Sequence, residues 1–181
     1  MKPLLSVCIL AYNRANLLPP LLDSILTQDY RNFEIVICED RSRQRTDIAR
    51  IAGEYTSRHP GYIRYFENEQ TLGYDGNLRR LVECATGDYC MFMGNDDLVC
   101  PGALGAIAQA VEAHANVGVV LRSYAAFDDD PAQIVQEFRY FDRELVFPAG
   151  ADSIGTVFRR SVVISGMVVK RAPALAVATD R

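Results

Sequence analysis

The first strand-like stretch of the chain reads Leu4-Leu5-Ser6-Val7-Cys8-Ile9-Leu10, and it runs into the polar sequence Ala11-Tyr12-Asn13-Arg14. A near-continuous apolar run of this length is typical of a strand that is buried on both faces. A helix is expected next, ending near Gln28, because apolar side chains recur along one stripe. Pro19 and Pro20 fit only in its first turn, where their missing N–H groups cost little.

The same two patterns alternate along the next hundred residues. Further strands are expected at residues 33–38, 62–67, 89–93 and 117–121, and helices at residues 48–55, at 76–86 and from Pro101 to about residue 111. This alternation predicts a single α/β domain of Rossmann-like type, with a mostly parallel sheet covered by helices on both faces. After residue 124 the pattern weakens. We expect an irregular excursion with short strands at 135–147, a strand at 165–170 and then the start of a helix.

Composition limits the classes of partner. The chain has 181 residues, of which 49% are hydrophobic and 23% charged, and a net charge of -4. This charge offers no basic field for nucleic acid, so no nucleic-acid partner is expected and an anionic ligand must be held locally. The cysteines number five and form no CxxC pair. Three of them, Cys8, Cys38 and Cys90, fall in apolar runs and are interpreted as buried thiols of a reducing compartment.

The sequence also bears on location. Met1-Lys2-Pro3 leads directly into a strand, without a signal peptide. Residues 162–177 are the most apolar late stretch, and Lys170, Arg171 and Pro173 interrupt them, so no membrane segment is expected in this chain. We therefore expect a cytoplasmic protein, either free or peripheral at the inner face of the membrane.

Polar clusters follow three of the predicted parallel strands. They are Ala11-Tyr12-Asn13-Arg14, Glu39-Asp40 and Asn95-Asp96-Asp97. In open parallel sheets, ligands bind beyond the carboxyl ends of the strands, so these clusters are predicted to meet in one site.

Each cluster has a structural and a functional interpretation. Two adjacent carboxylates beside an apolar strand repel each other unless a cation joins them, and Mg²⁺ or Mn²⁺ accepts such oxygen ligands. Alternatively, Asp97 caps the helix after Pro101. Asp40 either caps the next helix or turn or accepts a hydrogen bond from a base or ribose. Tyr12 is either a half-buried core residue or a flat surface for stacking a nucleobase.

The chain resembles the family 2 glycosyltransferases of the GT-A fold. The resemblance runs in order from residue 4 to about residue 120. It is carried by residues 6–14, 22–28, 33–42 and 68–77, by Ala85-Thr86-Gly87-Asp88-Tyr89, by Asn95-Asp96-Asp97 and by Pro101-Gly102-Ala103-Leu104. Residues 165–171 resemble a late strand of such enzymes. This chain differs from the usual family sequence at Glu39, Arg41, Gly76 and Asn95.

The resemblance implies a nucleoside-diphosphate sugar donor, commonly a UDP-sugar, and a divalent metal, Mn²⁺ or Mg²⁺. It implies that residues 1–124 bind the nucleotide sugar and that residues 125–181 begin an acceptor-side region that is incomplete at its C-terminus. Asp97, the last residue of a DXD-like motif, would bind the metal. The donor-binding residues it implies are Ala11, Tyr12, Asn13, Arg14, Asp40, Gly73, Asn77, Asn95 and Asp96.

The implied reaction is inverting transfer of the sugar to an unknown acceptor, which is a saccharide, a lipid-linked molecule or a protein. A role in cell-envelope or surface polysaccharide synthesis is expected from the family at large. The family's general base is a late Asp or Glu. Asp180 is the nearest candidate in this chain and Asp152 the next, and the base is expected to be missing.

Two alternatives to an active glycosyltransferase remain open. One is a nucleotide-sugar-binding module without catalysis, either truncated or degenerate. The other is a nucleotidyltransferase, although Asn13-Arg14-Ala15-Asn16 is not the glycine-rich basic loop that such an enzyme uses. A dinucleotide-dependent dehydrogenase is disfavoured, because no GxGxxG motif follows the first strand.

Overall fold

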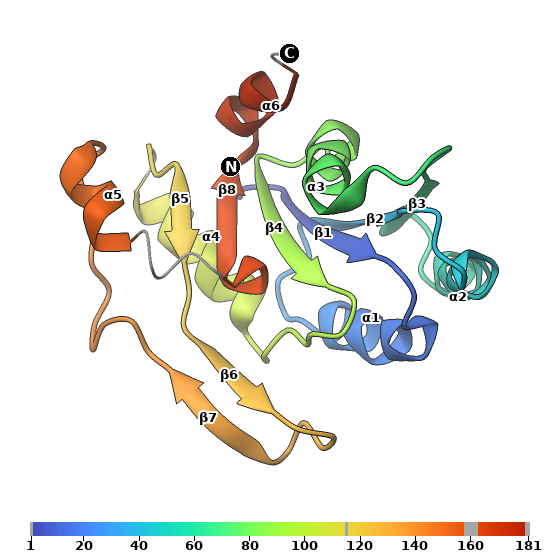
Figure 1. Ribbon diagram of the computed structural model, residues 1–181. Helices are drawn as coiled ribbons and strands as arrows, with labels where there is room; N and C mark the ends of the chain where they lie inside the picture. The colour runs from blue at the N-terminus through green and yellow to red at the C-terminus, as the bar shows by residue number, and fades with distance from the viewer. Residues whose placement is uncertain (1, 115, 158–162, 180–181) are drawn as a thin grey trace.

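The computed structural model describes residues 2–114, 116–157 and 163–179. Its main sheet has the strand order β3-β2-β1-β4-β8-β5 (Figure 1). These strands are β1 (Leu5–Ala11), β2 (Phe33–Glu39), β3 (Ile63–Glu67), β4 (Tyr89–Gly94), β5 (Val119–Leu121) and β8 (Met167–Lys170). β1 pairs in parallel with both β2 and β4, and β2 pairs in parallel with β3. The predicted mostly parallel α/β sheet is therefore confirmed.

β8 is the antiparallel member of the sheet. It lies between β4 and β5 and runs opposite to both. The expected strand at 165–170 is shorter than predicted, because the 3-10 turn η3 (Ile164–Gly166) precedes β8. The part of the chain after residue 124 therefore supplies an interior strand to the main sheet, and β5 joins the sheet only through β8.

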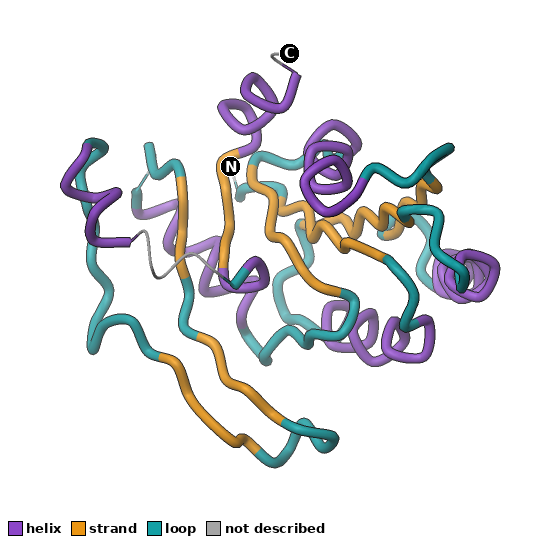
Figure 2. Tube along the Cα trace, viewed as in Figure 1, coloured by secondary structure: helices purple, strands orange, loops and turns teal. Residues whose placement is uncertain are grey.

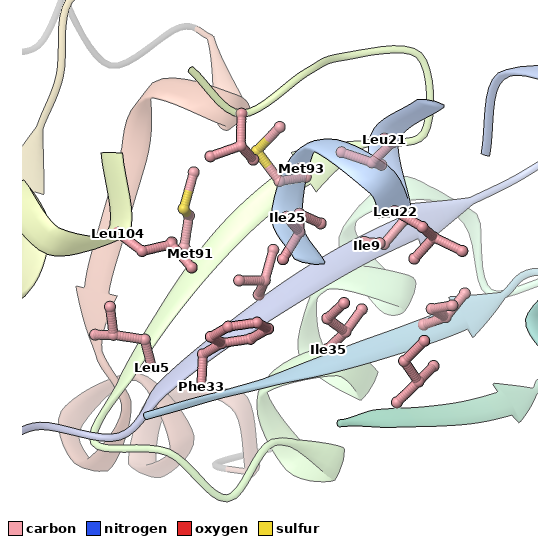
Figure 3. Packing of buried hydrophobic residues seen from close by; sticks show 14 of the residues in the cluster. Leu5, Ile9, Leu21, Leu22, Ile25, Phe33, Ile35, Met91, Met93 and Leu104 are labelled. Atoms are coloured by element: carbon pink, nitrogen blue, oxygen red, sulfur yellow. The ribbon is translucent and has the colours of Figure 1, made fainter. Parts of the chain in front are cut away.

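Helices cover both faces of the sheet, as the sequence predicts. α1 (Leu18–Leu26), α2 (Arg45–Arg58) and α4 (Ala103–Ala113) bury their apolar stripes in one cluster with the strands. In Figure 3, Ile25 of α1 and Leu104 of α4 lie over Leu5, Ile9 and Met91 of β1 and β4. α3 (Gly73–Cys84) and α6 (Arg171–Thr179) pack on the opposite face. Four cysteines are buried, including the three predicted to be, and Cys100 is exposed.

Two helix starts differ from the sequence prediction. α3 begins at Gly73 rather than Gly76, because a distant carboxylate, described below, holds its first amides. α4 begins at Ala103, two residues after Pro101, because Gly102 precedes it in the left-handed conformation with φ of 75°. The prolines of α1 occupy its first turn as predicted, after the short 3-10 turn η1 (Ala15–Leu17).

A β-hairpin projects from the main sheet. β6 (Tyr124–Phe127) and β7 (Ile134–Phe138) pair with each other in a separate two-stranded sheet, and α5 (Ala151–Val157) follows (Figure 2). β7 and the residues after it fall in the predicted irregular excursion at 135–147, whereas β6 lies before it. The hairpin tip carries Asp128, Asp129 and Asp130, and it forms a turn in which Asp130 Oδ1 accepts the Ala132 amide at 3.0 Å. Among the described residues, no helix combines the length and apolar character that a membrane crossing requires.

Candidate functional site

The three polar clusters meet at one edge of the sheet. β1 is in register with both neighbours, so that Ala11 lies opposite Glu39 of β2 and Leu10 opposite Gly94 of β4. Two hydrogen bonds join the loops beyond these ends. The Asp40 amide donates to Ala11 O at 3.0 Å, and Asn95 Nδ2 donates to Asn13 O at 2.7 Å. The parallel arrangement therefore brings together segments that are up to 82 residues apart in sequence.

The loop after β1 presents an aromatic ring and a cation. Ala11 is buried, whereas Tyr12 is 52% exposed, so the core interpretation of Tyr12 is wrong. Asn13 and Arg14 both have left-handed backbone conformations, with φ of 55° and 52°. This turn directs Arg14 toward the loop after β4, where its guanidinium forms an ion pair with the exposed Asp96 carboxylate.

Asp40 lies in a buried network with the start of α3. Its carboxylate accepts the Leu72 amide at 2.7 Å, the Gly73 amide at 2.9 Å and Asn68 Nδ2 at 2.9 Å. Asp40 therefore caps a helix, but it is α3 and not α2, the next helix after β2, which its structural interpretation predicted. These contacts do not test its predicted role toward a base.

Asn77, another predicted donor-binding residue, belongs to the same network. It is buried, donates from Nδ2 to Cys38 O at 3.0 Å and accepts from Asn68 at 3.0 Å. The structure therefore places Asn77 behind Asp40 and Gly73 rather than at the exposed edge. Asn68, which joins Asp40 to Asn77, was absent from the predicted set, and its only signal in the sequence is its place at the start of the resembling stretch 68–77.

Asp96 and Asp97 converge on Gly94, the last residue of β4. A Cβ atom built on Gly94 would lie 2.9 Å from both Asp96 Oδ1 and Asp97 Oδ2. The two carboxylates thus fold over the same side of the glycine, in space that a larger residue would fill. Asn95, between Gly94 and Asp96, is buried and points back to the β1 loop.

Asp97 is held by Ser165, a residue that the sequence analysis did not select. Ser165 Oγ donates to Asp97 Oδ2 at 2.5 Å and accepts the Gly94 amide at 3.1 Å. Burial raises the pKa of the Asp97 carboxyl above its usual range, and the charge of Asp96 raises it further, although the Ser165 hydrogen bond opposes both effects. The alternative role of Asp97 as a helix cap is not observed, because Gly102 is the N-cap residue of α4 and the Asp97 side chain bonds Ser165 instead.

The donor atoms at this edge suit a hard divalent cation. Asp96, Asp97 and Ser165 offer only oxygen, the ligand that Mg²⁺ and Mn²⁺ prefer. Within the described residues, no group of three or more His, Cys, Asp or Glu side chains could hold a metal ion. The residues therefore fit a cation that is shared with the phosphates of a substrate, rather than one enclosed by protein ligands alone.

Neither candidate for the catalytic base is found at the site among the residues that the structure describes. Asp180, the first candidate, lies outside the described residues. Asp152 is in the first turn of α5, which lies beside β5 and away from the carboxyl end of β4 in Figure 1. Asp152 is thus not brought to the site.

Comparisons with known proteins bear on the family and the fold of the chain. The family model described as Glycosyl transferase family 2 matches residues 6–162. A curated relative, the "Putative glycosyltransferase EpsE" of Bacillus subtilis, is 32% identical over 127 residues, which are 70% of this chain and 45% of EpsE. The chain spans about half or less of the length of the curated relatives it matches.

Solved structures show the same fold. The TarS 1-349 structure of S. aureus in complex with UDP-GlcNAc has a TM-score of 0.72 and 20% identity, with 95% of this chain and 46% of that chain covered. The mannosyltransferase PcManGT of Pyrobaculum calidifontis, in complex with GDP-Man and Mn²⁺, has a TM-score of 0.57 and 26% identity, with 67% and 36% covered. Both are consistent with a GT-A sheet of the type described above.

Proposed function

The chain belongs to glycosyl transferase family 2, and from this premise we propose that it binds a nucleoside-diphosphate sugar at the carboxyl ends of β1, β2 and β4 and takes part in transfer of the sugar. The observation that carries the proposal is the convergence of Asp96 and Asp97 on Gly94, beside Arg14 and the exposed ring of Tyr12. A diphosphate needs positive charge, and a nucleobase needs a flat apolar surface. This edge offers Arg14, two carboxylates that would hold a cation, and the Tyr12 ring.

The donor we propose is a UDP-sugar. The TarS structures with UDP and UDP-GlcNAc support this choice, whereas PcManGT is complexed with GDP-Man. The exposed Tyr12 ring offers a stacking surface that suits either base, so it is the test below that distinguishes them.

Each residue of the edge has a proposed role. Tyr12 stacks on the base, and the neighbouring Ala11 leaves room for it. Asp40 accepts a hydrogen bond from the base while it caps α3 through Gly73. Arg14 exchanges its contact with Asp96 for the diphosphate, which is sterically reasonable because both side chains are exposed. Three predicted donor-binding residues shape the site from behind: Asn13 and Asn95 hold the β1 and β4 loops together, and Asn77 supports the start of α3.

A divalent cation, Mn²⁺ or Mg²⁺, would be held by Asp97 with Asp96 beside it. When bound, such a cation stabilises the negative charge that develops on the leaving nucleoside diphosphate. The protein's own contribution is to fix the Asp97 carboxylate through Ser165 and to keep the β4 end free of a Cβ atom at Gly94.

The reaction we propose is a direct displacement with inversion at the anomeric carbon. An acceptor hydroxyl oxygen forms the new bond to that carbon, and the bond from the carbon to the diphosphate oxygen breaks. The hydroxyl proton passes to a general base, which must lie within hydrogen-bond reach of the acceptor. Asp152 lies in α5 and is not brought to the site, so we propose that the base is a late Asp or Glu, as the family resemblance implies.

The test is calorimetric titration of UDP, GDP, dTDP and UDP-GlcNAc, each with and without Mn²⁺. Wild type, Asp97→Ala and Asp129→Ala are compared. Asp129→Ala is the matched control, because it removes a carboxylate at the exposed hairpin tip, away from the site. We expect one nucleotide to bind in a Mn²⁺-dependent manner, and this dependence to be lost in Asp97→Ala and kept in Asp129→Ala.

Two outcomes would argue against the proposal. If folded wild type binds no nucleotide, the donor site is not in this chain. If binding is unaffected by Mn²⁺ and by Asp97→Ala, the metal assignment fails. A module without catalysis would bind the donor and transfer nothing to any acceptor, so binding followed by assays of sugar release from UDP-GlcNAc separates that alternative from an enzyme.

A further inference from the structure

Ser165 connects the late part of the chain to the end of β4. It lies in η3, directly before β8, and β8 pairs with β4 (Figure 1). Its hydroxyl oxygen is 3.1 Å from the Gly94 amide nitrogen and 2.5 Å from Asp97 Oδ2. The two residues joined by the shorter contact are 68 positions apart in sequence.

The direction of these hydrogen bonds is fixed by chemistry. A backbone amide can only donate, so the Gly94 N–H occupies a lone pair of Ser165 Oγ. The single hydroxyl proton of Ser165 is then free to point to the Asp97 carboxylate, which can only accept when ionised. Gly94 thus orients the hydroxyl, and the hydroxyl orients the carboxylate.

Ser165 holds Asp97 through one carboxylate oxygen, Oδ2. A carboxylate fixed through one oxygen presents the other in a defined direction. Metal ligands are commonly oriented by partners of this kind, which bond the ligand and not the metal.

We propose that Ser165 is a positioning residue of the donor site, which holds Asp97 so that Oδ1 faces the divalent cation. This inference rests on the proposed function. It makes the metal affinity of the site depend on the segment that contains η3 and β8, although that segment was predicted to belong to the acceptor side. The metal-dependent part of donor binding therefore involves Ser165 in addition to residues 1–124.

The hydrogen bond from Ser165 stabilises the charged form of Asp97. Asp97 is half-buried beside the like charge of Asp96, and both conditions disfavour its ionised form. The Ser165 hydroxyl offsets part of this cost before any cation arrives. In the contrary arrangement, the cation takes Oδ2, Ser165 competes with it, and removing the hydroxyl strengthens metal binding. Whether Mn²⁺ affinity falls or rises when the Ser165 hydroxyl is removed therefore decides between the two arrangements.

The experiment measures Mn²⁺ affinity directly, from the electron paramagnetic resonance signal of free Mn²⁺, in the presence and absence of UDP. The variants are Ser165→Ala and Ser165→Thr, which retains the hydroxyl. Ser57→Ala is the matched control, because Ser57 bonds its own helix at Gly53 O on α2. We expect Ser165→Ala to weaken Mn²⁺ binding about 10-fold, as loss of such an outer partner typically does. Ser165→Thr and Ser57→Ala should remain close to wild type.

UDP binding in EDTA separates the positioning role from a purely structural one. If the Ser165 hydroxyl acts only by positioning Asp97 for the metal, wild type and Ser165→Ala should have equal affinity for UDP in EDTA. If Ser165 instead supports the fold of the site, Ser165→Ala should bind UDP more weakly even in EDTA. Circular dichroism spectra identify any variant that does not fold. If Ser165→Ala does not fold, Ser165→Cys takes its place, since a thiol is a much weaker donor of similar size.

The possible failures are distinguishable. Unchanged or tighter Mn²⁺ binding by Ser165→Ala, in a protein whose Asp97→Ala variant loses Mn²⁺, overturns the positioning role and leaves the donor site intact. The positioning role is also overturned if Ser165→Ala loses as much UDP affinity in EDTA as it does with Mn²⁺. Absence of both Mn²⁺ and nucleotide binding in wild type overturns the proposed function, and with it this inference.

Discussion

Asp40, at the end of β2, accepts the backbone amide of Gly73 at 2.9 Å and so fixes where α3 begins. The same carboxylate takes the neighbouring Leu72 amide at 2.7 Å. Free amides at a helix start need acceptors, and a carboxylate there also interacts favourably with the helix dipole. The residue predicted to contact the donor base therefore also sets the position of a helix 33 residues later.

Asp40→Asn tests the structural part of this relationship. An asparagine has one acceptor oxygen instead of two, so at least one of the two amides loses its partner and an NH₂ group faces it. We expect the free energy of unfolding to fall by about 1–3 kcal/mol, the usual cost of an unsatisfied buried group. Denaturation in urea measures it. Asp129→Asn, on the exposed hairpin tip, should change the value little, and an equally small change in Asp40→Asn would contradict the capping role.

Gly94→Ala tests the convergence of the two carboxylates. The added methyl group would lie 2.9 Å from both Asp96 Oδ1 and Asp97 Oδ2, so at least one carboxylate must move. We expect Mn²⁺-dependent nucleotide binding to weaken at least about 10-fold, in the range seen when metal ligands lose their orientation. Calorimetry measures this affinity.

Gly53→Ala is the matched control for that substitution. Gly53 lies inside α2, with nothing within 4 Å of an added Cβ atom. Because alanine is the better helix former, this variant should be more stable by about 0.5–1 kcal/mol and bind nucleotide normally. Normal binding by Gly94→Ala as well would mean that the two carboxylates do not act together on a cation.

The parts of the fold that follow from local pattern were predictable. β1, β2 and β4 are buried on both faces, and their mainly apolar sequences indicate this without any knowledge of their neighbours. Their parallel order then places the polar residues after each strand at one edge. For this reason the convergence of Tyr12 and Asp96 could be expected from the sequence.

The parts that depend on distant contacts were not predictable. Nothing in residues 167–170 indicates that β8 inserts between β4 and β5, because a short apolar run fits an edge or an interior position equally well. The start of α3 is set by Asp40, far from the helix in sequence, rather than by a local cap. Ser165 has no pattern at all: a single serine before a strand becomes informative only when its contact with Asp97 is seen.

Glu34 gives a prediction for the pH dependence of stability. This buried carboxylate of β2 accepts from Ser6 Oγ at 2.7 Å, from the Thr86 amide at 2.6 Å and from Arg64 at 3.1 Å. Burial alone would raise the pKa of Glu34, but these hydrogen bonds outweigh it and lower the pKa below its usual value. A carboxyl group with a lowered pKa in the folded state stabilises the protein above its unfolded pKa, and this contribution is lost as the pH falls through the folded value.

Glu34→Gln should therefore be less stable than wild type by about 1–3 kcal/mol at pH 7, since hydrogen bonds to a charged group are lost. The difference should shrink as the pH falls below about 4.3, the ordinary pKa of glutamate. Urea denaturation at pH 7 and at acid pH measures it. The control is Glu54→Gln, an exposed partner of Arg50 on α2, which should cost only about 0.3–0.5 kcal/mol. A difference for Glu34→Gln that grows toward acid pH would contradict the argument.

Tyr12→Ala separates binding from stability at the exposed edge. The ring is 52% exposed, so its removal should change the free energy of unfolding by less than about 0.5 kcal/mol, as for most surface substitutions. If the ring stacks on the nucleobase, affinity for the nucleotide should fall by roughly 10-fold, within the range for loss of one aromatic stacking partner. Calorimetry with UDP in the presence of Mn²⁺ measures this loss.

Tyr12→Phe separates the contribution of the Tyr12 ring from that of its hydroxyl. It keeps the flat ring and removes only the hydroxyl, so stacking predicts an affinity close to wild type. If Tyr12→Phe binds as poorly as Tyr12→Ala, the hydroxyl and not the ring makes the contact, and the base lies elsewhere. If both variants bind like wild type, the base does not lie over Tyr12, and the donor must instead be held through Arg14, Asp40 and the Asp97 metal site.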